Sequence, residues 1–198
     1  MSQTWVTPVT LTGRAVRLEP LDADRHAEGL WQVVSPDTFQ YFASVPTEWT
    51  LEGFRKYLQN LLAVLDMCPF CQVEVATNQS VGVTTFMEIR PAHRGLEIGS
   101  TWIAKTHQGT TINPEAKYLL LRHAFENLKA IRVQLKTDSR NLQSQRAIEK
   151  IGAKREGVLR NHYIMPDGHY RHSVYFSVTD EEWPEVKAKL ETRLGYTP

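Results

Sequence analysis

Apolar side chains follow two different periods in this chain, and the order of these periods limits the folds that it can adopt. Apolar residues at every second position predict strands, and apolar residues at every third or fourth position predict helices. The expected strands are 15–21, 70–76, 81–89, 96–104, 131–138 and one run on each side of a turn at 166–168, and the expected helices are 22–34, 50–65, 113–128, 141–152 and the C-terminal tail. One strand, two helices and three strands are thus followed by alternating helices and strands. This order predicts an α/β domain with a mixed sheet.

Length and composition favour one globular unit. The 198 residues, 41% of them hydrophobic, suffice for a core without disulfides or metal ions, and we expect residues 1–198 to form a single domain. No apolar run approaches the roughly 20 residues that a membrane span needs, and the N-terminus lacks the basic and apolar regions of a signal peptide. We therefore expect a cytoplasmic protein that has no membrane partner.

The net charge of +1 is unevenly distributed along the chain. Residues 1–100 hold 7 Lys and Arg against 11 Asp and Glu, whereas residues 101–160 hold 12 against 5. The second segment would attract a polyanionic ligand, or it forms an ordinary solvated basic surface. It lacks the array of aromatic residues that suits stacking on bases, so we do not expect nucleic acid to be a direct partner.

The two cysteines occur as Cys68-Pro-Phe-Cys71. Such a pair is typical of redox motifs and of half a zinc site. A redox motif should open a helix, but a strand-like run follows here, and no second pair of cysteines completes a zinc site. We interpret both cysteines as structural and predict no metal.

Residues 106–116, THQGTTINPEA, allow two interpretations. The stretch is either an ordinary turn with Asn113 as the N-cap of a helix and Pro114 in its first turn, or a loop whose free N–H groups bind an anion such as a diphosphate. The cap explains Asn113, Pro114 and Glu115 but leaves residues 108–111 without a role.

Residues 96–126 (LEIGSTWIAKTHQGTTINPEAKYLLLRHAFE) resemble the cofactor-binding core of GNAT-superfamily N-acetyltransferases. The similarity continues through residues 141–160 (NLQSQRAIEKIGAKREGVLR) and ends in residues 167–178 (DGHYRHSVYFSV), which resemble the branch that contains ribosomal-protein N-terminal alanine and serine acetyltransferases. In all, the resemblance covers about residues 14–183. It implies a mixed, mostly antiparallel sheet of about seven strands flanked by helices.

The sequence departs from the family pattern at Thr111, Asn113 and His172. Thr111 stands where the family loop carries its second glycine, Asn113 at a position for a small residue, and His172 where the branch often has an acidic residue. Threonine is poorly suited to positive φ. Either this loop avoids that conformation, or coenzyme A binds weakly.

The resemblance also implies catalytic roles. Glu97 would take the proton from the amine, directly or through water, and Ser144 would protonate the leaving thiolate. The alternatives remain open: Glu97 could be an exposed strand residue paired with a cation, and Asn141 could be only the N-cap of the helix that carries Ser144. The implied acetyl-CoA contacts are Trp102, Ile103, Gln108, Gly109, Thr110, Thr111, Ile112, Asn113, Asn141 and Arg146.

The acceptor is the part of the site that the sequence describes least. Aromatic residues in loop 35–50 could cover the acceptor or pack two helices together, and His162 and Tyr163 are further candidates. By resemblance, we expect direct acetyl transfer in a ternary complex from acetyl-CoA, as cosubstrate, to the amine of a protein or peptide N-terminus. A small-molecule amine (a polyamine, amino acid or antibiotic) and a non-catalytic acyl-CoA-binding module are the alternatives. A homodimer is possible.

Overall fold

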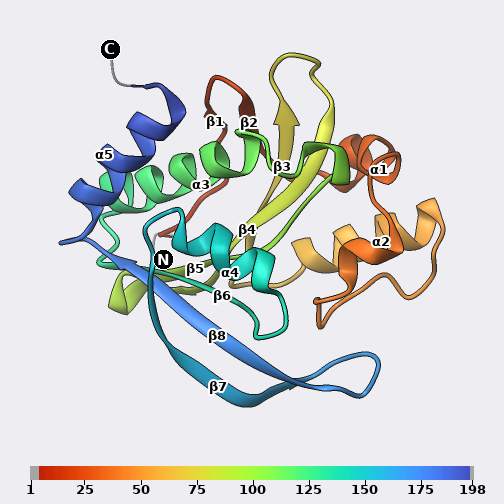
Figure 1. Cartoon of the computed structure of the whole chain (residues 1–198). Helices are drawn as coiled ribbons and strands as arrows, with labels where there is room; N and C mark the ends of the chain where they lie inside the picture. Colours follow the sequence, from red (N-terminus) through yellow and green to blue (C-terminus); the bar gives the residue numbers. More distant parts are fainter. Residues whose placement is uncertain (1–4, 197–198) are drawn as a thin grey trace.

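A computed structural model describes residues 5–196 as one mixed sheet with five α-helices (Figure 1). The strands are β1 Leu11–Thr12, β2 Val16–Pro20, β3 Cys68–Glu74, β4 Ser80–Arg90, β5 Gly95–Ile103, β6 Arg132–Asp138, β7 Lys154–Ile164 and β8 Tyr170–Thr179. The helices are α1 Ala23–Trp31, α2 Leu51–Leu62, α3 Ile112–Arg122, α4 Leu142–Glu149 and α5 Trp183–Leu194, and α3 continues into a π-helical turn at His123–Asn127. The predicted order of helices and strands is confirmed.

The sheet has the strand order β1-β2-β3-β4-β5-β6-β8-β7. Every neighbouring pair is antiparallel except β5 and β6, which are parallel. The predicted mixed, mostly antiparallel sheet is therefore confirmed. It has eight strands rather than about seven, because a two-residue strand, β1, pairs with β2 and is too short to show a period.

Apolar residues cover the two faces of the sheet unequally. One cluster joins the inner sides of α3, α4 and α5 to one face, over β2 to β6 and β8. In Figure 1 these three helices lie in front of the sheet. A second cluster joins α1 and α2 to the opposite face, but only over β3, β4 and β5. Within residues 5–196, neither cluster packs a helix against the part of that opposite face formed by β6 and β8. This part of the face carries polar side chains.

The parallel strands β5 and β6 pair only at their beginnings. Gly95, Leu96 and Glu97 pair with Arg132, Val133 and Gln134, and the pairing then stops although both strands continue. Ser100 takes a positive φ of 44°, and the register between β4 and β5 shifts nearby. β5 therefore diverges from β6 after Glu97 and leaves an opening in the middle of the sheet.

Cys68 and Cys71 lie in β3, and their side chains pack into different clusters on the two faces of the sheet. Both are free thiols. Burial raises the pKa of Cys68 to about 11 and that of Cys71 to about 12, so neither is a reactive thiolate near neutral pH. Their burial in the two clusters agrees with the interpretation of both cysteines as structural residues.

No helix within residues 5–196 is long and apolar enough to cross a membrane. The same residues contain no group of three or more His, Cys, Asp or Glu side chains placed to hold a metal ion.

Candidate active site

The opening between β5 and β6 lies near the loop before α3 and the first turn of α4. The side-chain amide of Gln143, in α4, donates a hydrogen bond of 3.3 Å to Oε1 of Gln108, in the loop. The predicted anion-binding loop and the predicted α4 residues thus approach each other. The fold brings together two segments that lie more than thirty residues apart in the sequence.

The loop adopts a conformation that suits its sequence. Gly109 takes the positive φ of 80°, whereas Thr111 has φ −74° and ψ −15°. A Cβ at Gly109 would contact nothing within 4 Å, so only backbone conformation demands glycine there. Of the two alternatives for Thr111, the structure supports the first: the loop does not need a positive φ at this position.

The start of α3 differs from the cap interpretation. Thr111 is the N-cap and makes no side-chain cap hydrogen bond, so the prediction of Asn113 as N-cap is wrong. Oδ1 of Asn113 is buried without a partner among the described residues. Glu115 turns to the other end of the sheet, where it accepts hydrogen bonds from the amides of Arg14, Ala15 and Val16.

These features fit a diphosphate ligand. Within residues 5–196, the amides of Gly109 and Thr111 have no intramolecular acceptor, and Ile112 begins a helix whose dipole favours an anion. We therefore retain the loop residues 108–113 as the expected phosphate contacts.

The later residues of β5 contribute differently. Trp102 directs its indole ring into the cluster under α1 and α2, so only its backbone is available to a ligand in the opening. Ile103 is partly buried against the other cluster. Contacts from these two residues to a cofactor arm remain a prediction that rests on their place beside the opening.

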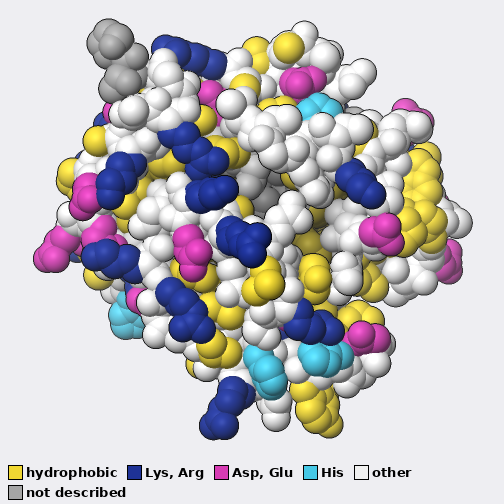
Figure 2. Space-filling view, viewed as in Figure 1, with side chains coloured by type: hydrophobic (Ala, Val, Ile, Leu, Met, Phe, Trp, Pro, Cys, Tyr) yellow, Lys and Arg dark blue, Asp and Glu magenta, His cyan; other side chains and the backbone are white. Residues whose placement is uncertain are grey.

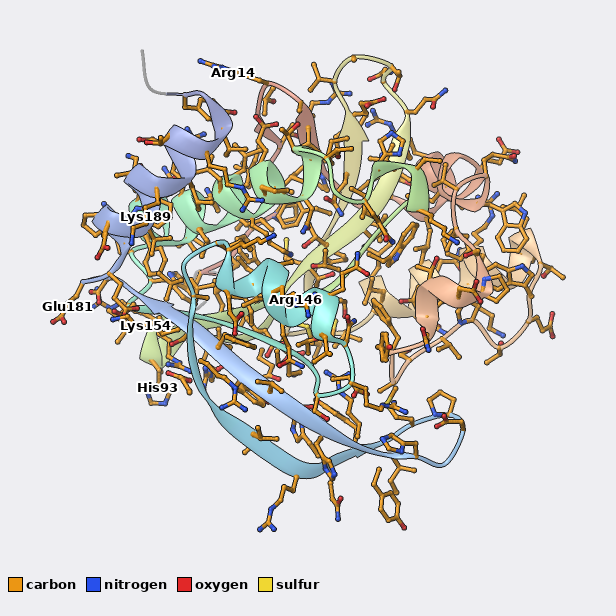
Figure 3. The ribbon with its side chains drawn as sticks, viewed as in Figure 1. Arg14, His93, Arg146, Lys154, Glu181 and Lys189 are labelled. Atoms are coloured by element: carbon orange, nitrogen blue, oxygen red, sulfur yellow. The ribbon has the colours of Figure 1, made fainter. Side chains whose placement is uncertain are left out.

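The first turn of α4 combines a cap with the predicted proton donor. Oδ1 of Asn141 accepts a 3.0 Å hydrogen bond from the Ser144 amide, so Asn141 is the N-cap of α4. Its contact with the cofactor stays a prediction. Ser144 is half-buried, and Arg146 is exposed on the same helix (Figure 3). Figure 2 shows Lys and Arg side chains over the centre of this face, as the excess of positive charge in residues 101–160 leads one to expect.

On the opposite face, Glu97 stands at the point where β5 and β6 separate. Its side chain is only 1% exposed, so the prediction of an exposed strand residue does not hold, although its pairing with a cation does. Oε2 lies 3.2 Å from Nζ of Lys136 and accepts a 3.0 Å hydrogen bond from Gln134. Lys136 also donates to Glu88 at 2.5 Å. Two carboxylates therefore share one ammonium group.

Burial and charge act in opposite directions in this cluster. Burial raises the pKa of Glu97 above its usual value, although Lys136 and Gln134 lower it. Burial lowers the pKa of Lys136, but its attraction to Glu97 and its bond to Glu88 outweigh that effect, so its pKa lies above the usual value. Glu97 is thus a stronger base than an ordinary glutamate. The lysine beside it, Lys136, is protonated at neutral pH.

The polar face extends from Glu97 along β8. Tyr175 stands opposite Lys136 and Ser173 opposite Asp138 in the register of β6 and β8, so all four side chains lie on this face. Arg171, two residues before Ser173, completes the row. His162 accompanies it, since its Nδ1 lies 3.0 Å from the Ser173 hydroxyl. Tyr163 also lies here, beneath the Arg171 guanidinium. The structure therefore brings the predicted candidates His162 and Tyr163 to this polar face.

Loop 35–50 has a mixed role. Phe39 and Trp49 pack with Trp31 and Tyr57, in agreement with the packing alternative. Tyr41 instead reaches the polar face: its carbonyl accepts a 3.2 Å hydrogen bond from Arg171.

Sequence reasoning missed Glu88, Lys136, Arg171 and a buried lysine, Lys117. Lys117 is 5% exposed on α3. Among residues 5–196, its Nζ donates only to the hydroxyls of Thr101 (2.6 Å) and Thr84 (3.1 Å). Burial lowers its pKa to about 7. The alternation in β8 could have revealed Arg171, because it places a polar row opposite Val174, Phe176 and Val178. Nothing in the sequence distinguishes Lys117 from an exposed helical lysine.

Residues 15–154 match the family model described as "Acetyltransferase (GNAT) domain". The chain belongs to the GNAT acetyltransferase family. GNAT acetyltransferases use acetyl-CoA, and this chain is an acetyltransferase of that type.

Relatives support the same assignment. The chain is 31% identical to the Bacillus subtilis (strain 168) protein "Probable N-acetyltransferase YjcK" over 76% of this chain and 86% of that protein. It is 32% identical to "Putative ribosomal N-acetyltransferase YdaF" of the same organism over 86% of this chain and 92% of that protein. The crystal structure of a "putative acetyltransferase" from T. thermophilus is 42% identical, covers 96% of this chain and 100% of its own, and superposes with a TM-score of 0.90.

Proposed function

We propose that this GNAT enzyme acetylates the α-amine of a protein or peptide N-terminus. The observation that carries the proposal is the row of polar side chains that leads from Glu97, at the separation of β5 and β6, along β8 to the outside. This row lies on the face opposite α3 and α4, so an acceptor can approach the opening from one side of the sheet and acetyl-CoA from the other.

The roles of the residues follow from their places. Bound acetyl-CoA supplies the acetyl group and a thiolate leaving group. Glu97 accepts the proton that the attacking amine loses, directly or through one water. Ser144, on the other side of the opening, donates a proton to the departing sulfur and regains one from solvent. Residues 108–113 and Arg146 hold the phosphates.

The size and openness of the acceptor side favour a peptide. An open depression of about 950 Å³ lies beside the polar row and is lined by Val158, Leu159, Arg160, Asn161, His162 and His172. A closed pocket would suit a small amine better, because small ligands are usually enclosed. An α-amine, with a pKa near 8, is also easier to deprotonate than a lysine, with a pKa near 10.4. The name of the relative YdaF points in the same direction.

The test is an acceptor panel with purified protein. Thiol release from acetyl-CoA would be followed with peptides that begin with Ala or Ser, with the same peptides blocked at the N-terminus but carrying an internal Lys, and with polyamines and free amino acids. We expect turnover only with free N-termini, with the acetyl group located on the α-amine by mass spectrometry. Turnover of small amines alone would replace the proposal with the small-molecule alternative. Binding of acetyl-CoA without any turnover would support a non-catalytic module.

A further inference from the structure

Arg171 is a buried cation that forms no salt bridge with any other residue in the range 5–196. Its side chain lies in β8 and the residue is 8% exposed. Nε donates to the Ser173 hydroxyl at 3.1 Å, and Nη1 donates to the Tyr41 carbonyl at 3.2 Å. Within residues 5–196, no carboxylate oxygen lies within 4 Å of the guanidinium group, and Nη2 has no hydrogen-bond acceptor.

The nearby carboxylates are already committed to other cations. Asp138 accepts from the side chain and the amide of Arg140 through both of its oxygens. Glu88 and Glu97 share Lys136, as described above. Arg171 is therefore held by two neutral oxygens and by the ring of Tyr163, whose centroid lies 5.5 Å from the guanidinium carbon.

Such an arrangement is costly unless a ligand completes it. Taking a charge out of water without a partner destabilises a protein. Burial lowers the pKa of Arg171 below its usual value, although the charges of Asp138 and Glu97 act in the opposite direction. A guanidinium remains charged at neutral pH. The N–H groups left on Nη1 and Nη2 present the planar fork that binds a carboxylate through two parallel hydrogen bonds.

The position of Arg171 limits where the carboxylate of a bound ligand can lie. Arg171 precedes Tyr175 by four residues, Tyr175 stands opposite Lys136, and Lys136 reaches Glu97. The Arg171 guanidinium carbon lies 5.5 Å and Lys136 Nζ 5.6 Å from the centroid of the Tyr163 ring, and Nζ lies 3.2 Å from Oε2 of Glu97. The free fork is therefore within reach of the first few residues of a peptide whose α-amine lies at Glu97. An extended peptide covers about 3.3–3.6 Å per residue.

We propose that Arg171 binds an acidic side chain at one of residues 2 to 4 of the acceptor peptide. This inference rests on the proposed function, since it assigns a sequence preference to the same acceptor side. His162, next to Ser173, offers no competing charge, because burial and the neighbouring cations Lys136 and Arg171 lower its pKa. Arg171 then acts as a specificity residue that contacts the acceptor and takes no part in proton transfer.

A positional scan of the acceptor tests this inference. Seven-residue peptides with a free N-terminal Ser and an amidated C-terminus would carry one Asp at position 2, 3, 4, 5 or 6, each matched by the Asn peptide. At 0.2 M salt, which screens long-range attraction, we expect Asp at one of positions 2 to 4 to lower KM about tenfold relative to Asn. Asp at position 6 should give no gain. A tripeptide with a free C-terminus, compared with its amide, shows whether a main-chain carboxylate can occupy the same fork.

Variants separate recognition from a structural role, since Arg171 also holds loop 35–50 through Tyr41. Arg171→Gln should raise KM for the preferred Asp peptide to that of its Asn partner and leave the Asn peptide nearly unchanged, and Arg171→Lys should retain only part of the preference. Arg155→Gln removes an exposed charge from β7 and should keep the full preference. A structural role alone would raise KM for every peptide alike and lower the melting temperature.

The outcomes distinguish this inference from the proposed function. If peptides are acetylated but Asp and Asn peptides are equivalent at every position, Arg171 does not read an acidic residue while N-terminal acetylation stands. A preference that survives Arg171→Gln would also overturn the inference. If no peptide is acetylated at all, the proposed function fails, and the inference fails with it.

Discussion

Nζ of Lys136 lies 3.2 Å from Oε2 of Glu97, and this contact sets the charge of the proposed base. Burial alone would favour the neutral carboxyl, whereas the ammonium group favours the carboxylate. Glu97 is thus held between two opposing influences at the point where β5 and β6 separate. Changing Glu97 should lower the rate, whereas changing Lys136 should shift the pH dependence of the rate.

Glu97→Gln should abolish most of the activity with little loss of structure. Glutamine can still bond to Gln134 but cannot accept a proton, and loss of a general base typically costs about 10²–10⁴-fold in rate. We expect kcat to fall about 100-fold or more while the affinity for acetyl-CoA stays the same, as measured by thiol release and by calorimetry. Glu28→Gln, an exposed change on α1, is the control. A Glu97→Gln enzyme that keeps half of its rate would remove Glu97 from the mechanism.

Lys136→Met should move the pH dependence of the reaction. Without the ammonium group, burial and the charge of Glu88 act on Glu97 with less opposition, so its pKa rises. A base works only when it is ionised, so the acid limb of the kcat/KM profile should shift to higher pH. The profile would be measured from pH 5 to 9 with saturating acetyl-CoA and a varied concentration of acceptor. An acid limb that is unmoved, or that moves to lower pH, would mean that another group controls the rate.

The sequence predicts this part of the site incompletely, for a physical reason. Alternation places Glu97 on a strand and family resemblance gives it a role, but its burial depends on β6, which lies more than thirty residues later. Lys136 and Glu88 become its partners only because β4, β5 and β6 are neighbours in the sheet. Periodicity assigns the faces of each strand separately, and it cannot tell which polar residue will stand beside which.

Lys117→Met should stabilise the protein near neutral pH. The pKa of Lys117 is about 7 in the folded state against about 10.4 in an unfolded chain, so the unfolded state binds more protons between these values. The stability of the folded state therefore rises with pH across that window. The cost of burying the charged Lys117 side chain is fully present below about pH 7. Methionine fills a similar volume without a charge. We expect a gain of about 1–3 kcal/mol at pH 6, or several degrees in melting temperature.

The control for Lys117 is Lys56→Met, which removes an exposed lysine of α2. Urea unfolding of both variants at pH 6, 7.5 and 9 gives the comparison. The gain from Lys117→Met should shrink as pH rises, because the wild-type lysine is then neutral in the folded state and loses its penalty. A destabilised Lys117→Met protein at pH 6 would show that the bonds to Thr84 and Thr101 outweigh burial.

Gly109 and Thr111 should respond differently to substitution, although the family pattern emphasises the Thr111 position. Gly109→Ala forces a side chain into φ 80°, which costs roughly 1–2 kcal/mol, and it should weaken acetyl-CoA binding about fivefold or more. Thr111→Gly should change binding little, because Thr111 already has a helical conformation. Calorimetric titration of acetyl-CoA checks both. Tighter binding by Thr111→Gly would mean that the bound loop needs a positive φ there.

The loop also shows where a family pattern can mislead. The family pattern places a glycine, which tolerates a positive φ, at the position of Thr111. In this chain the positive φ lies two residues earlier, at Gly109. Asn113 looks like a cap by type, yet the helix begins before it, at Ile112. Residue preferences near a helix start fix its boundary only to within a residue or two, and that margin decides which amides remain free for a phosphate.

Ser144→Ala and Asn141→Ala should separate proton donation from helix capping. The cap bond joins Oδ1 of Asn141 to the backbone amide of residue 144, so Ser144→Ala leaves it intact and should not change the melting temperature. If the hydroxyl protonates the leaving sulfur, kcat should fall about tenfold or more, most clearly at high pH, where free protons cannot substitute. Asn141→Ala should instead cost about 1 kcal/mol of stability. Normal turnover of Ser144→Ala across the pH range would assign the proton to solvent or to another residue.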